Sequence, residues 1–380
     1  MFMSPANTNR PTYADINLEN LRFNLESVKN FIDEDLKYMA VVKANAYGHG
    51  GVECAKTLEN AGADCLGVAL PEEAVELRNN GIKIPIICLG GFWAGQENLI
   101  LENRLSTVIF RLDTAEKLNR AAGGKGVRAD IHLKIDTGMG RLGVRFDAVK
   151  EFCAGLKKFK NLNVAGIMTH FAAADNLREN DFTNLQTERF YKAVADCEDA
   201  GFQPIYKDLA NSPGAIAHKN SRGNTVRLGG ILYGLDGDVL PQDIAKPGLK
   251  PVMSICTEIS YLKKVLKGET LGYSRAFKTK RDSIIATIPI GYYDGFNRAL
   301  SNRGRVIVNN TFAPVVGRIS MDWTIIDVTD VPNISVEQEV IIIGRQGDLV
   351  ITAEDVARLA DTISYEITCG ISARVPRIYK

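Results

Sequence analysis

The sequence predicts an α/β fold, a (β/α)8 TIM-type barrel, followed by a mostly β C-terminal domain. Three observations lead to this prediction. Short apolar runs alternate with amphipathic stretches from residue 14 to about residue 235. Prolines and glycine then cluster at Pro241, Pro247, Gly248 and Pro251, as they do in linkers. Beyond this cluster the chain consists of strand-like runs separated by turn residues.

The apolar runs of the first part have the length of strands that are buried on both faces. Strands of this kind, joined by helices, form parallel sheets. About eight such units over roughly 220 residues match the size of a TIM barrel. We expect the strands at residues 38–43, 64–69, 84–89, 107–110, 129–135, 164–170, 205–210 and 225–228.

Amphipathic helices are expected between the strands, and several have clear start signals. Pro71 stands in a first helical turn and is followed by Glu72 and Glu73, whose charges suit the positive end of the helix dipole. A doubly wound open sheet is the alternative fold, but no G-x-G-x-x-G follows the first strand, which weakens it. The expected helices cover residues 52–60, 71–80, 114–122, 146–159 and 182–200.

The C-terminal part is predicted to be a mostly antiparallel β domain. Asn309 and Asn310 separate two apolar runs and predict a hairpin turn. One helix is expected there, at residues 352–361. We therefore divide the chain into a barrel at residues 14–245 and a β domain at residues 246–380. The strands of the β domain are expected at residues 255–262, 284–290, 305–308, 324–328 and 340–343.

Composition excludes several classes of protein. Lysine and arginine number 46 against 45 for aspartate and glutamate, and this balance argues against a nucleic-acid partner. No apolar run is long enough to cross a bilayer, and the N-terminus lacks the basic and apolar regions of a signal peptide. The seven cysteines are scattered without a C-x-x-C pair, which is typical of buried thiols in a reducing compartment. We therefore expect a cytoplasmic protein without a membrane partner.

Lys43 is the first candidate for a chemical role. It ends the first apolar run and opens a loop that contains Gly48, Gly50 and Gly51. Glycines allow the backbone to approach a ligand closely. A lysine at such a junction is partly desolvated, which lowers the pKa of its amine and makes it a nucleophile or a base.

The ends of the other predicted strands carry polar residues as well. In a barrel these ends meet at one mouth, where the chemistry takes place. Each residue alone has an ordinary structural explanation, such as a buried ion pair or a tight turn. Together these explanations are less convincing, because each of several independent strand ends would need its own. A serine hydroxyl and the backbone N–H groups of glycines are suited to bind a phosphate. The converging residues are Lys134, Arg141, His170, Ser212, Arg227, Gly229 and Gly230.

The chemistry is narrowed by what the sequence lacks. The four histidines show no metal-ligand spacing, so no metal is expected. There is no G-x-S-x-G elbow for a serine hydrolase. A reactive lysine beside a phosphate site indicates a Schiff base with a phosphorylated aldehyde, namely pyridoxal 5'-phosphate. A Schiff-base aldolase is the other chemistry that these residues could serve.

At this point the motifs are recognisable. Residues 41–50, Val-Val-Lys-Ala-Asn-Ala-Tyr-Gly-His-Gly, resemble the pyridoxal-phosphate attachment signature of the alanine racemase family. The resemblance covers essentially the whole chain and implies a barrel followed by a β domain. In that family the N-terminal strand commonly joins the β domain, so residues 1–13 are expected to pack there. Further ordered matches lie at residues 134–143, 169–172, 211–212, 227–230, 272–274, 290–295, 317–322 and 374–377.

The resemblance implies a homodimeric racemase that interconverts L- and D-alanine and supplies D-alanine for peptidoglycan. Lys43 would hold the cofactor covalently and act as one base. Tyr273, contributed by the β domain of the other subunit, would act as the second base on the opposite face of the substrate. Two bases suit the reaction, because one base would tend to return the proton to the face from which it took it.

The resemblance also implies the remaining contacts. Arg227 would contact the pyridine nitrogen, with His170 supporting it. Lys134 is carbamylated in several members of the family and pairs there with the arginine of the substrate site. The phosphate would be held by Tyr47, Ser212, Gly229, Gly230 and Tyr292, and the substrate carboxylate by Arg141 and Met321.

One position departs from the family pattern. Several members carry tyrosine at the position of Ala373, where it contacts the phosphate and narrows the entrance. We therefore expect a wider entrance and hypothesise that serine is accepted as well as alanine. Two alternatives from related barrels are a non-catalytic cofactor carrier and a decarboxylase. The first lacks the β domain, and the second usually places an acid where Arg227 stands.

Overall fold

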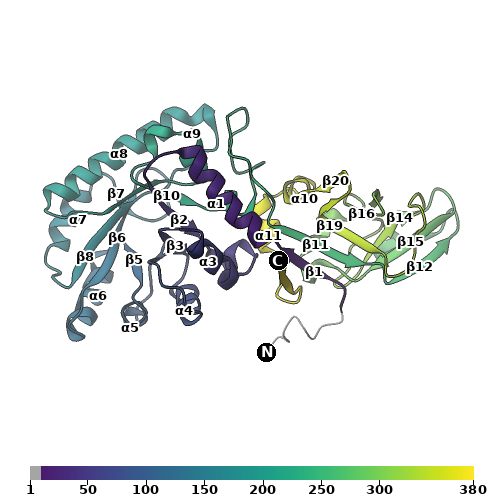
Figure 1. Ribbon diagram of the computed structural model, residues 1–380, viewed down its shortest axis with the longest axis horizontal. Helices are drawn as coiled ribbons and strands as arrows, with labels where there is room; N and C mark the ends of the chain where they lie inside the picture. Colours follow the sequence, from purple (N-terminus) through teal and green to yellow (C-terminus); the bar gives the residue numbers. More distant parts are fainter. Residues whose placement is uncertain (1–9) are drawn as a thin grey trace.

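The protein consists of two lobes set end to end, as the computed structural model shows (Figure 1). The structure describes residues 10–380. One lobe holds a ring of parallel strands surrounded by helices, and the other holds twisted β-sheets. The expected packing of residues 1–13 against the β domain therefore falls partly outside the described residues.

The barrel predicted from the sequence is confirmed. All eight strands pair in parallel, and the ring closes because β5 also pairs with β6, with Thr107 opposite Ile131 and Ile109 opposite Leu133. This closure rules out the open-sheet alternative. The strands, in their order around the ring, are β5 (Ser106–Ile109), β4 (Ile86–Cys88), β3 (Cys65–Val68), β2 (Lys37–Val41), β10 (Thr225–Leu228), β9 (Tyr206–Ala210), β8 (Leu162–Met168) and β6 (Ala129–Asp136).

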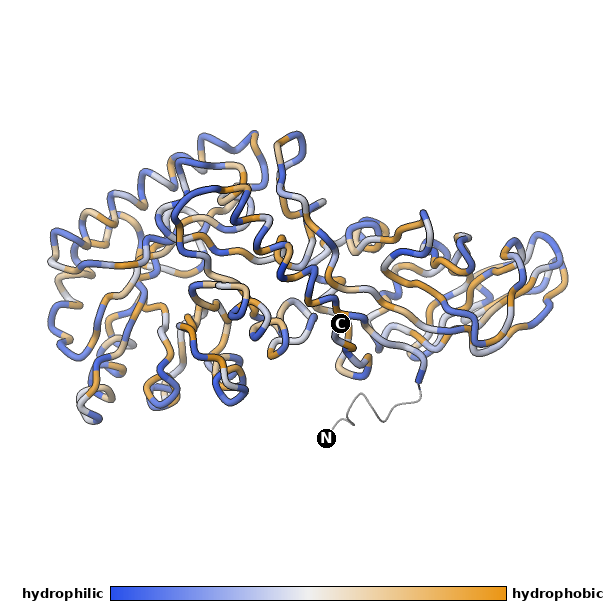
Figure 2. The backbone as a smooth tube through the Cα atoms, viewed as in Figure 1, coloured by the Kyte–Doolittle hydropathy of each residue, from blue (hydrophilic) through white to orange (hydrophobic). Residues whose placement is uncertain are grey.

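Apolar side chains fill the interior of the ring, so the barrel has a packed core. Five buried residues from five strands contact one another there: Met39, Cys65, Ile87, Val108 and Met168. Figure 2 shows the strands as largely apolar and the surrounding helices as mixed. A short extra strand, β7 (Val144–Arg145), pairs in parallel with the last residues of β6 at the mouth.

The helices around the barrel include those predicted and several others. The first helix, α1 (Leu18–Ile32), was not among the predictions, although its buried positions 21, 25, 28 and 32 follow helical spacing and Asn17 caps its start. The others are α2 (Lys43–Tyr47), α3 (Gly51–Asn60), α4 (Pro71–Asn79), α5 (Glu97–Glu102), α6 (Leu112–Gly124), α7 (Val149–Leu156), α8 (Asn180–Asp199) and α9 (Ser212–Ala217).

The second lobe is mostly antiparallel, as predicted. Its largest sheet runs in the order β17 (Thr311–Pro314), β16 (Arg305–Val308), β19 (Glu339–Gln346), β11 (Met253–Glu258), β1 (Tyr13–Ile16), β21 (Arg377–Tyr379), with β20 (Leu349–Ile351) paired to β19. The remaining strands are β12 (Tyr261–Val265), β15 (Ser283–Ile288) and β18 (Thr324–Asp327), and the pair β13 (Thr270–Leu271) and β14 (Phe277–Lys278).

Three local features of this lobe can be compared with the prediction. The hairpin turn is confirmed, because Asn309 and Asn310 join β16 to β17 with φ of 45° and 56°. The expected strand at residues 255–262 is wrong in extent, since it divides into β11 and β12. The expected helix is α10 (Ala353–Ala360), but a second helix, α11 (Ser364–Cys369), follows it.

The two lobes are linked at β1 and α11. Strand β1 precedes the barrel in sequence yet pairs with β11 and β21 of the β domain. Helix α11 lies between β20 and β21 of the β domain and contacts α2 of the barrel. The C-terminal segment is thereby brought to the barrel mouth.

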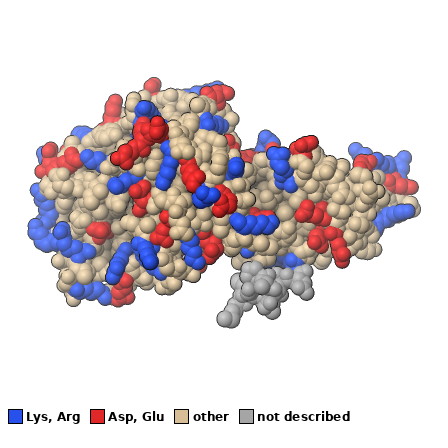
Figure 3. Space-filling model, viewed as in Figure 1, with Lys and Arg blue, Asp and Glu red and all other residues tan. Residues whose placement is uncertain are grey.

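Surface charge is mixed. On the face seen in Figure 3, acidic and basic side chains are interspersed over both lobes. This distribution agrees with the near-zero formal net charge of +1. Within residues 10–380, no helix combines the length and apolar character needed to cross a bilayer.

Candidate active site

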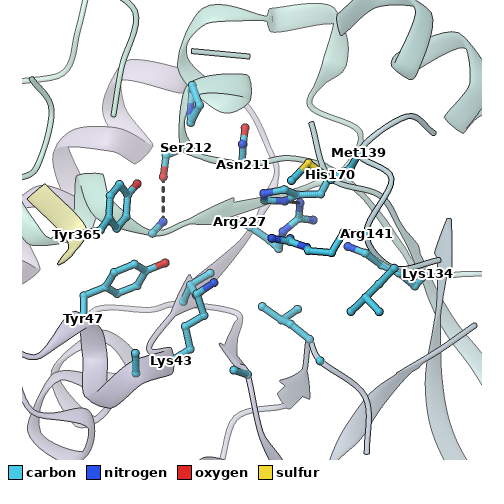
Figure 4. A pocket seen from close by; sticks show the side chains of 18 of the residues that line it. Lys43, Tyr47, Lys134, Met139, Arg141, His170, Asn211, Ser212, Arg227 and Tyr365 are labelled. Carbon is cyan, nitrogen blue, oxygen red and sulfur yellow. Dashed lines mark hydrogen bonds between the residues drawn. The ribbon is translucent and has the colours of Figure 1, made fainter. Parts of the chain in front are cut away.

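A cavity of about 540 Å³ lies where the barrel strands end. Most of the residues that the sequence singled out at the strand ends line this cavity, and Figure 4 shows their side chains around a common space. The predicted residues in the lining are Lys43, Tyr47, Lys134, Arg141, His170, Ser212, Arg227 and Gly229. Gly230 follows directly in the chain.

The segment after Lys43 has an unusual backbone. Ala44, Asn45, Ala46 and Tyr47 all have φ between 53° and 55°, so α2 is a left-handed turn built from residues other than glycine. The sequence did not indicate this turn, because its positive φ angles begin at residues that are not glycine. Glycine enters only at the end of the turn, at Gly48.

Hydrogen bonds from side chains within and outside the turn hold it in place. The amide of Ala44 donates to Oε1 of Glu73 at 2.6 Å. The side chain of Asn45 accepts from the amide of Gly51 at 2.6 Å. Nδ1 of the fully buried His49 lies 3.0 Å from the carbonyl oxygens of residues 46 and 47. These bonds offset a conformation that costs about 1–2 kcal/mol for each residue with a Cβ atom.

The strain gives a prediction for stability. Ala44 is exposed, so Ala44→Gly should relieve strain without loss of packing and raise the free energy of unfolding by about 1 kcal/mol. Ala154 is exposed in the right-handed helix α7, so Ala154→Gly should lower that free energy by about 1 kcal/mol. Urea unfolding measures both variants. Equal destabilisation by both would contradict the strained turn.

The amine of Lys43 lies in a cationic environment. Burial lowers its pKa below the ordinary value, and the charges of Arg141 and Arg227 lower it further. A larger fraction of the amine is therefore neutral near pH 7 than in an exposed lysine. A neutral amine is the form that attacks a carbonyl group.

Three hydroxyl groups surround the start of the Gly229–Gly230 segment. The amide of Gly229 donates to Oγ of Ser212 at 2.9 Å. A Cβ atom at Gly229 would lie 2.6 Å from the hydroxyl of Tyr47, and one at Gly230 would lie 2.6 Å from the hydroxyl of Tyr365. A larger residue at either position would therefore displace one of these hydroxyls. Figure 4 shows the three hydroxyls facing the same space.

These hydroxyls are suited to an anion. Burial raises the pKa of Tyr47 and of Tyr365 above the ordinary value, so both phenols stay protonated at neutral pH. Protonated hydroxyls donate hydrogen bonds to phosphate oxygens. The glycines leave room for such a group next to the backbone.

Arg227 and His170 lie in contact on the opposite side of the cavity. Nη2 of Arg227 is 3.1 Å from Nδ1 of His170. Burial, followed by the charge of Arg227, lowers the pKa of His170 to about 2, so the imidazole is neutral. Because arginine only donates, Nδ1 must accept this hydrogen bond. The proton of the imidazole is therefore on Nε2.

Lys134 is a second lysine with a perturbed amine. Burial, followed by the charge of Arg227, lowers its pKa to about 7. Its Nζ donates to the carbonyl oxygen of Thr169 at 3.3 Å. A large fraction of this amine is therefore unprotonated at neutral pH, which is the form that reacts with carbon dioxide.

Three predicted residues lie outside the cavity of their own chain. Tyr273, Tyr292 and Met321 belong to the β domain, and their side chains are 68%, 41% and 50% exposed. Tyr273 is the first residue of the short helix η5 (Tyr273–Arg275), which directly precedes β14. Figure 1 shows β14 at the end of the β domain that is farther from the barrel.

Comparison with known proteins identifies the family. Residues 16–237 match the family model described as alanine racemase, N-terminal domain, and residues 252–379 match that described as alanine racemase, C-terminal domain. An alanine racemase of Geobacter sulfurreducens is 43% identical over 376 residues, which is 97% of each chain. The chain belongs to the alanine racemase family.

Solved structures agree with this assignment. An alanine racemase of Clostridium difficile superposes with a TM-score of 0.92 at 38% identity, covering 98% of this chain and 97% of that one. An alanine racemase of Bartonella henselae, described with covalently bound pyridoxal phosphate, gives a TM-score of 0.87 at 28% identity, with coverage of 97% and 99%. Both domains of the chain therefore have the family architecture.

The structure adds residues that the sequence did not single out. Tyr365 and Cys369, both on α11, line the cavity, as do Met139 and Asn211. Tyr365 thus places a tyrosine side chain at the cavity. Ala373 is exposed and does not line this cavity, and the wider entrance expected at its position stays a prediction.

Proposed function

We propose that this protein is a pyridoxal-phosphate-dependent alanine racemase that interconverts L- and D-alanine with two bases. The observation that carries the proposal is Lys43 with a lowered pKa, in one cavity with the three hydroxyls at Gly229 and Gly230. Membership of the alanine racemase family supports the reaction type.

The residues present fit the cofactor. The hydroxyls of Tyr47, Ser212 and Tyr365 would hold its phosphate group, and Lys43 would attach its aldehyde carbon. Arg227, on the far side of the cavity, would face its ring nitrogen. When bound, pyridoxal phosphate supplies an electron-withdrawing ring that stabilises negative charge on the substrate α-carbon.

Two residues of the chain would transfer the proton, one on each face of the substrate. Lys43 would remove or return the α-proton on one face. Tyr273 of the partner subunit would serve the opposite face. Arg141, which lines the cavity, would bind the substrate carboxylate together with the backbone of Met321 from the partner. Arginine suits this task, because its planar donors match a carboxylate.

An exposed apolar surface on the β domain supports a homodimer. The amides of Tyr292 and Tyr293 donate to the carbonyl oxygens of residues 320 and 321, so the backbone of these two tyrosines lies beside that of Met321. Tyr293 and Trp323 are 57% and 47% exposed. Contiguous exposed apolar side chains are typical of interaction surfaces. Pairing with the barrel of a second copy would bring Tyr273, Tyr292 and Met321 to its cavity.

A racemisation assay tests the proposal. The protein is incubated with a panel of L-amino acids, with and without added pyridoxal phosphate, and the D-isomers are separated on a chiral column. We expect D-alanine to form fastest and to require the cofactor. Restoration of growth to a bacterial D-alanine auxotroph would support a role in peptidoglycan supply. No D-alanine in the presence of bound cofactor would contradict the proposed function.

Lys134 is proposed as a site of carbamylation. Its pKa of about 7 supports this, because the reaction needs the neutral amine. The product would place a carboxylate among the cations of the mouth, where Arg141 also lies. Carbon-13 NMR of protein equilibrated with labelled bicarbonate would show the carbamate signal, and Lys134→Ala should remove it.

Serine acceptance is also proposed, on physical grounds that do not depend on Ala373. A pocket for a methyl group discriminates against an added hydroxyl by only about a hundredfold. We therefore expect kcat/KM for L-serine to be below that for L-alanine by about that factor or less. Ala373→Tyr should leave the ratio of the two values unchanged, since residue 373 is outside the described lining. A lower ratio of the serine value to the alanine value in this variant would show that residue 373 lies at the entrance.

A further inference from the structure

A buried carboxylate lies behind Arg227, and neither cofactor binding nor proton transfer as proposed involves it. Asp208, on β9, is fully buried and forms an ion pair with Arg227 on the neighbouring strand β10. Nη1 of Arg227 donates to Oδ1 of Asp208. The other oxygen, Oδ2, has no hydrogen-bond partner among the described residues. Asp208 is absent from the lining of the cavity, so it would not touch a ligand there.

The hydrogen bonds of Arg227 show what this ion pair does. Nη2 donates to the carbonyl oxygens of Thr169 and Leu209 at 2.9 and 3.3 Å and to Nδ1 of His170 at 3.1 Å. Nη1 also donates to the backbone carbonyl oxygen of Asp208 at 3.5 Å, so the donors of both terminal nitrogens are directed at protein atoms. A guanidinium group has one further donor, the Nε–H. None of the described hydrogen bonds uses it, so it is the donor of Arg227 that remains for a ligand.

The charges around Asp208 are mainly positive. Burial raises the pKa of Asp208, whereas a group of cations, Arg227 and Lys134, lowers it. Against this group Asp208 supplies a fully buried negative charge. Burial of an unpaired guanidinium is unfavourable, and a partner carboxylate offsets that cost only when the geometry is good. Without Asp208, Arg227 would be expected to turn toward solvent in the cavity.

We infer that Asp208 is a positioning residue for the reaction: its buried carboxylate fixes the guanidinium of Arg227 against His170 and thereby sets both the free Nε–H donor and the tautomer of His170. The inference rests on the proposed function for its link to racemisation. The hydrogen-bond arrangement itself can be tested without turnover.

Histidine NMR provides that test, because the chain contains only four histidines. The full-length protein is labelled with nitrogen-15 in histidine and loaded with pyridoxal phosphate. In the wild type we expect the Nε2–H tautomer for His170. Asp208→Asn keeps the shape of the side chain but removes the charge, so the Nδ1 signal of His170 should move toward the averaged position of a freely exchanging imidazole. The buried His49 and His132 should keep their signals and act as internal references.

Kinetics provide the second readout. Misplacement of a group by about 1 Å can cost about a hundredfold in rate. We expect Asp208→Asn to lower kcat for alanine by about that factor, with a smaller change in KM. Asp208→Glu keeps the charge and serves if the first variant folds poorly, as judged by circular dichroism. Because the extra methylene displaces the carboxylate, it should produce an intermediate shift of the His170 signal and an intermediate loss of kcat.

Glu34→Gln is the matched control. Glu34 pairs with the buried Arg222, which precedes β10 and so lies near the opposite end of that strand from the cavity. This variant should leave the His170 signal and kcat as in the wild type. Asp208→Asn with unchanged His170 signals and kcat within about twofold of wild type would overturn the inference. A shift of all four histidines would also overturn it, since it would show a structural role. A wild type that fails to racemise alanine would overturn only the proposed function.

Discussion

Lys43→Ala should abolish both racemisation and cofactor attachment. The variant loses the group that would bind the aldehyde and one of the two bases. General acid–base catalysis alone contributes about 10²–10⁴-fold, and loss of the covalent link adds to this, so we expect kcat to fall by at least about 10⁴-fold. The measurement is chiral analysis of alanine after prolonged incubation.

Cofactor attachment is measured separately from the rate. Borohydride reduction of the wild type with pyridoxal phosphate should leave one cofactor attached to the peptide that contains Lys43, as a secondary amine formed with loss of water and gain of two hydrogens. Lys43→Ala should show no such adduct, whereas Lys134→Ala should retain it, although Lys134 also lines the cavity and also has a lowered pKa. An adduct on Lys134 in the wild type would contradict the assignment of Lys43. Racemisation by Lys43→Ala at more than a trace would contradict its role as a base.

The positions of most cavity residues could be predicted because a barrel converts sequence order into spatial order. Each parallel strand delivers its last residues to the same mouth. Lys43, His170 and Arg227 are distant in sequence, yet the pattern of apolar runs was enough to place them together. The closure between β5 and β6 could not be read from the pattern, since an open sheet has the same periodicity.

The features that were missed depend on tertiary contacts. The left-handed turn at α2 contains Ala44 and Ala46, residues whose local preference is for the right-handed helix. Contacts from Glu73 and His49, which lie outside the turn, help to stabilise it. Tyr365 is carried to the barrel mouth by α11, which lies near the C-terminal end of the chain, and no local pattern indicates that return.

The position of Asp208 in the sequence indicates a buried ion pair. The sequence Tyr206-Lys207-Asp208-Leu209-Ala210 places a carboxylate within an otherwise buried strand. A charge at such a position is rarely buried without a partner. The partner is Arg227, one strand away, and the two residues are 19 positions apart in sequence. Attention to strand interiors as well as strand ends would have found the pair.

Tyr273→Phe should be nearly inactive even though Tyr273 is 68% exposed in a single chain. The variant removes only the hydroxyl, so folding and cofactor attachment should be unchanged. Loss of the second base should lower kcat by about 10²–10⁴-fold. Tyr261, another exposed tyrosine of the β domain at 58%, gives the matched control Tyr261→Phe, which should keep full activity. Normal racemisation by Tyr273→Phe would contradict the two-base assignment.

Mixing two inactive variants shows whether the site is shared between subunits. In a heterodimer of Lys43→Ala with Tyr273→Phe, one site combines the intact Lys43 of one chain with the intact Tyr273 of the other, and the second site lacks both. Random exchange at equal concentrations should therefore restore about a quarter of the wild-type specific activity. If both residues acted within one chain, no mixture could exceed the activity of its components. Restored activity should also fall on dilution, because dissociation separates Tyr273 from the cavity that it completes.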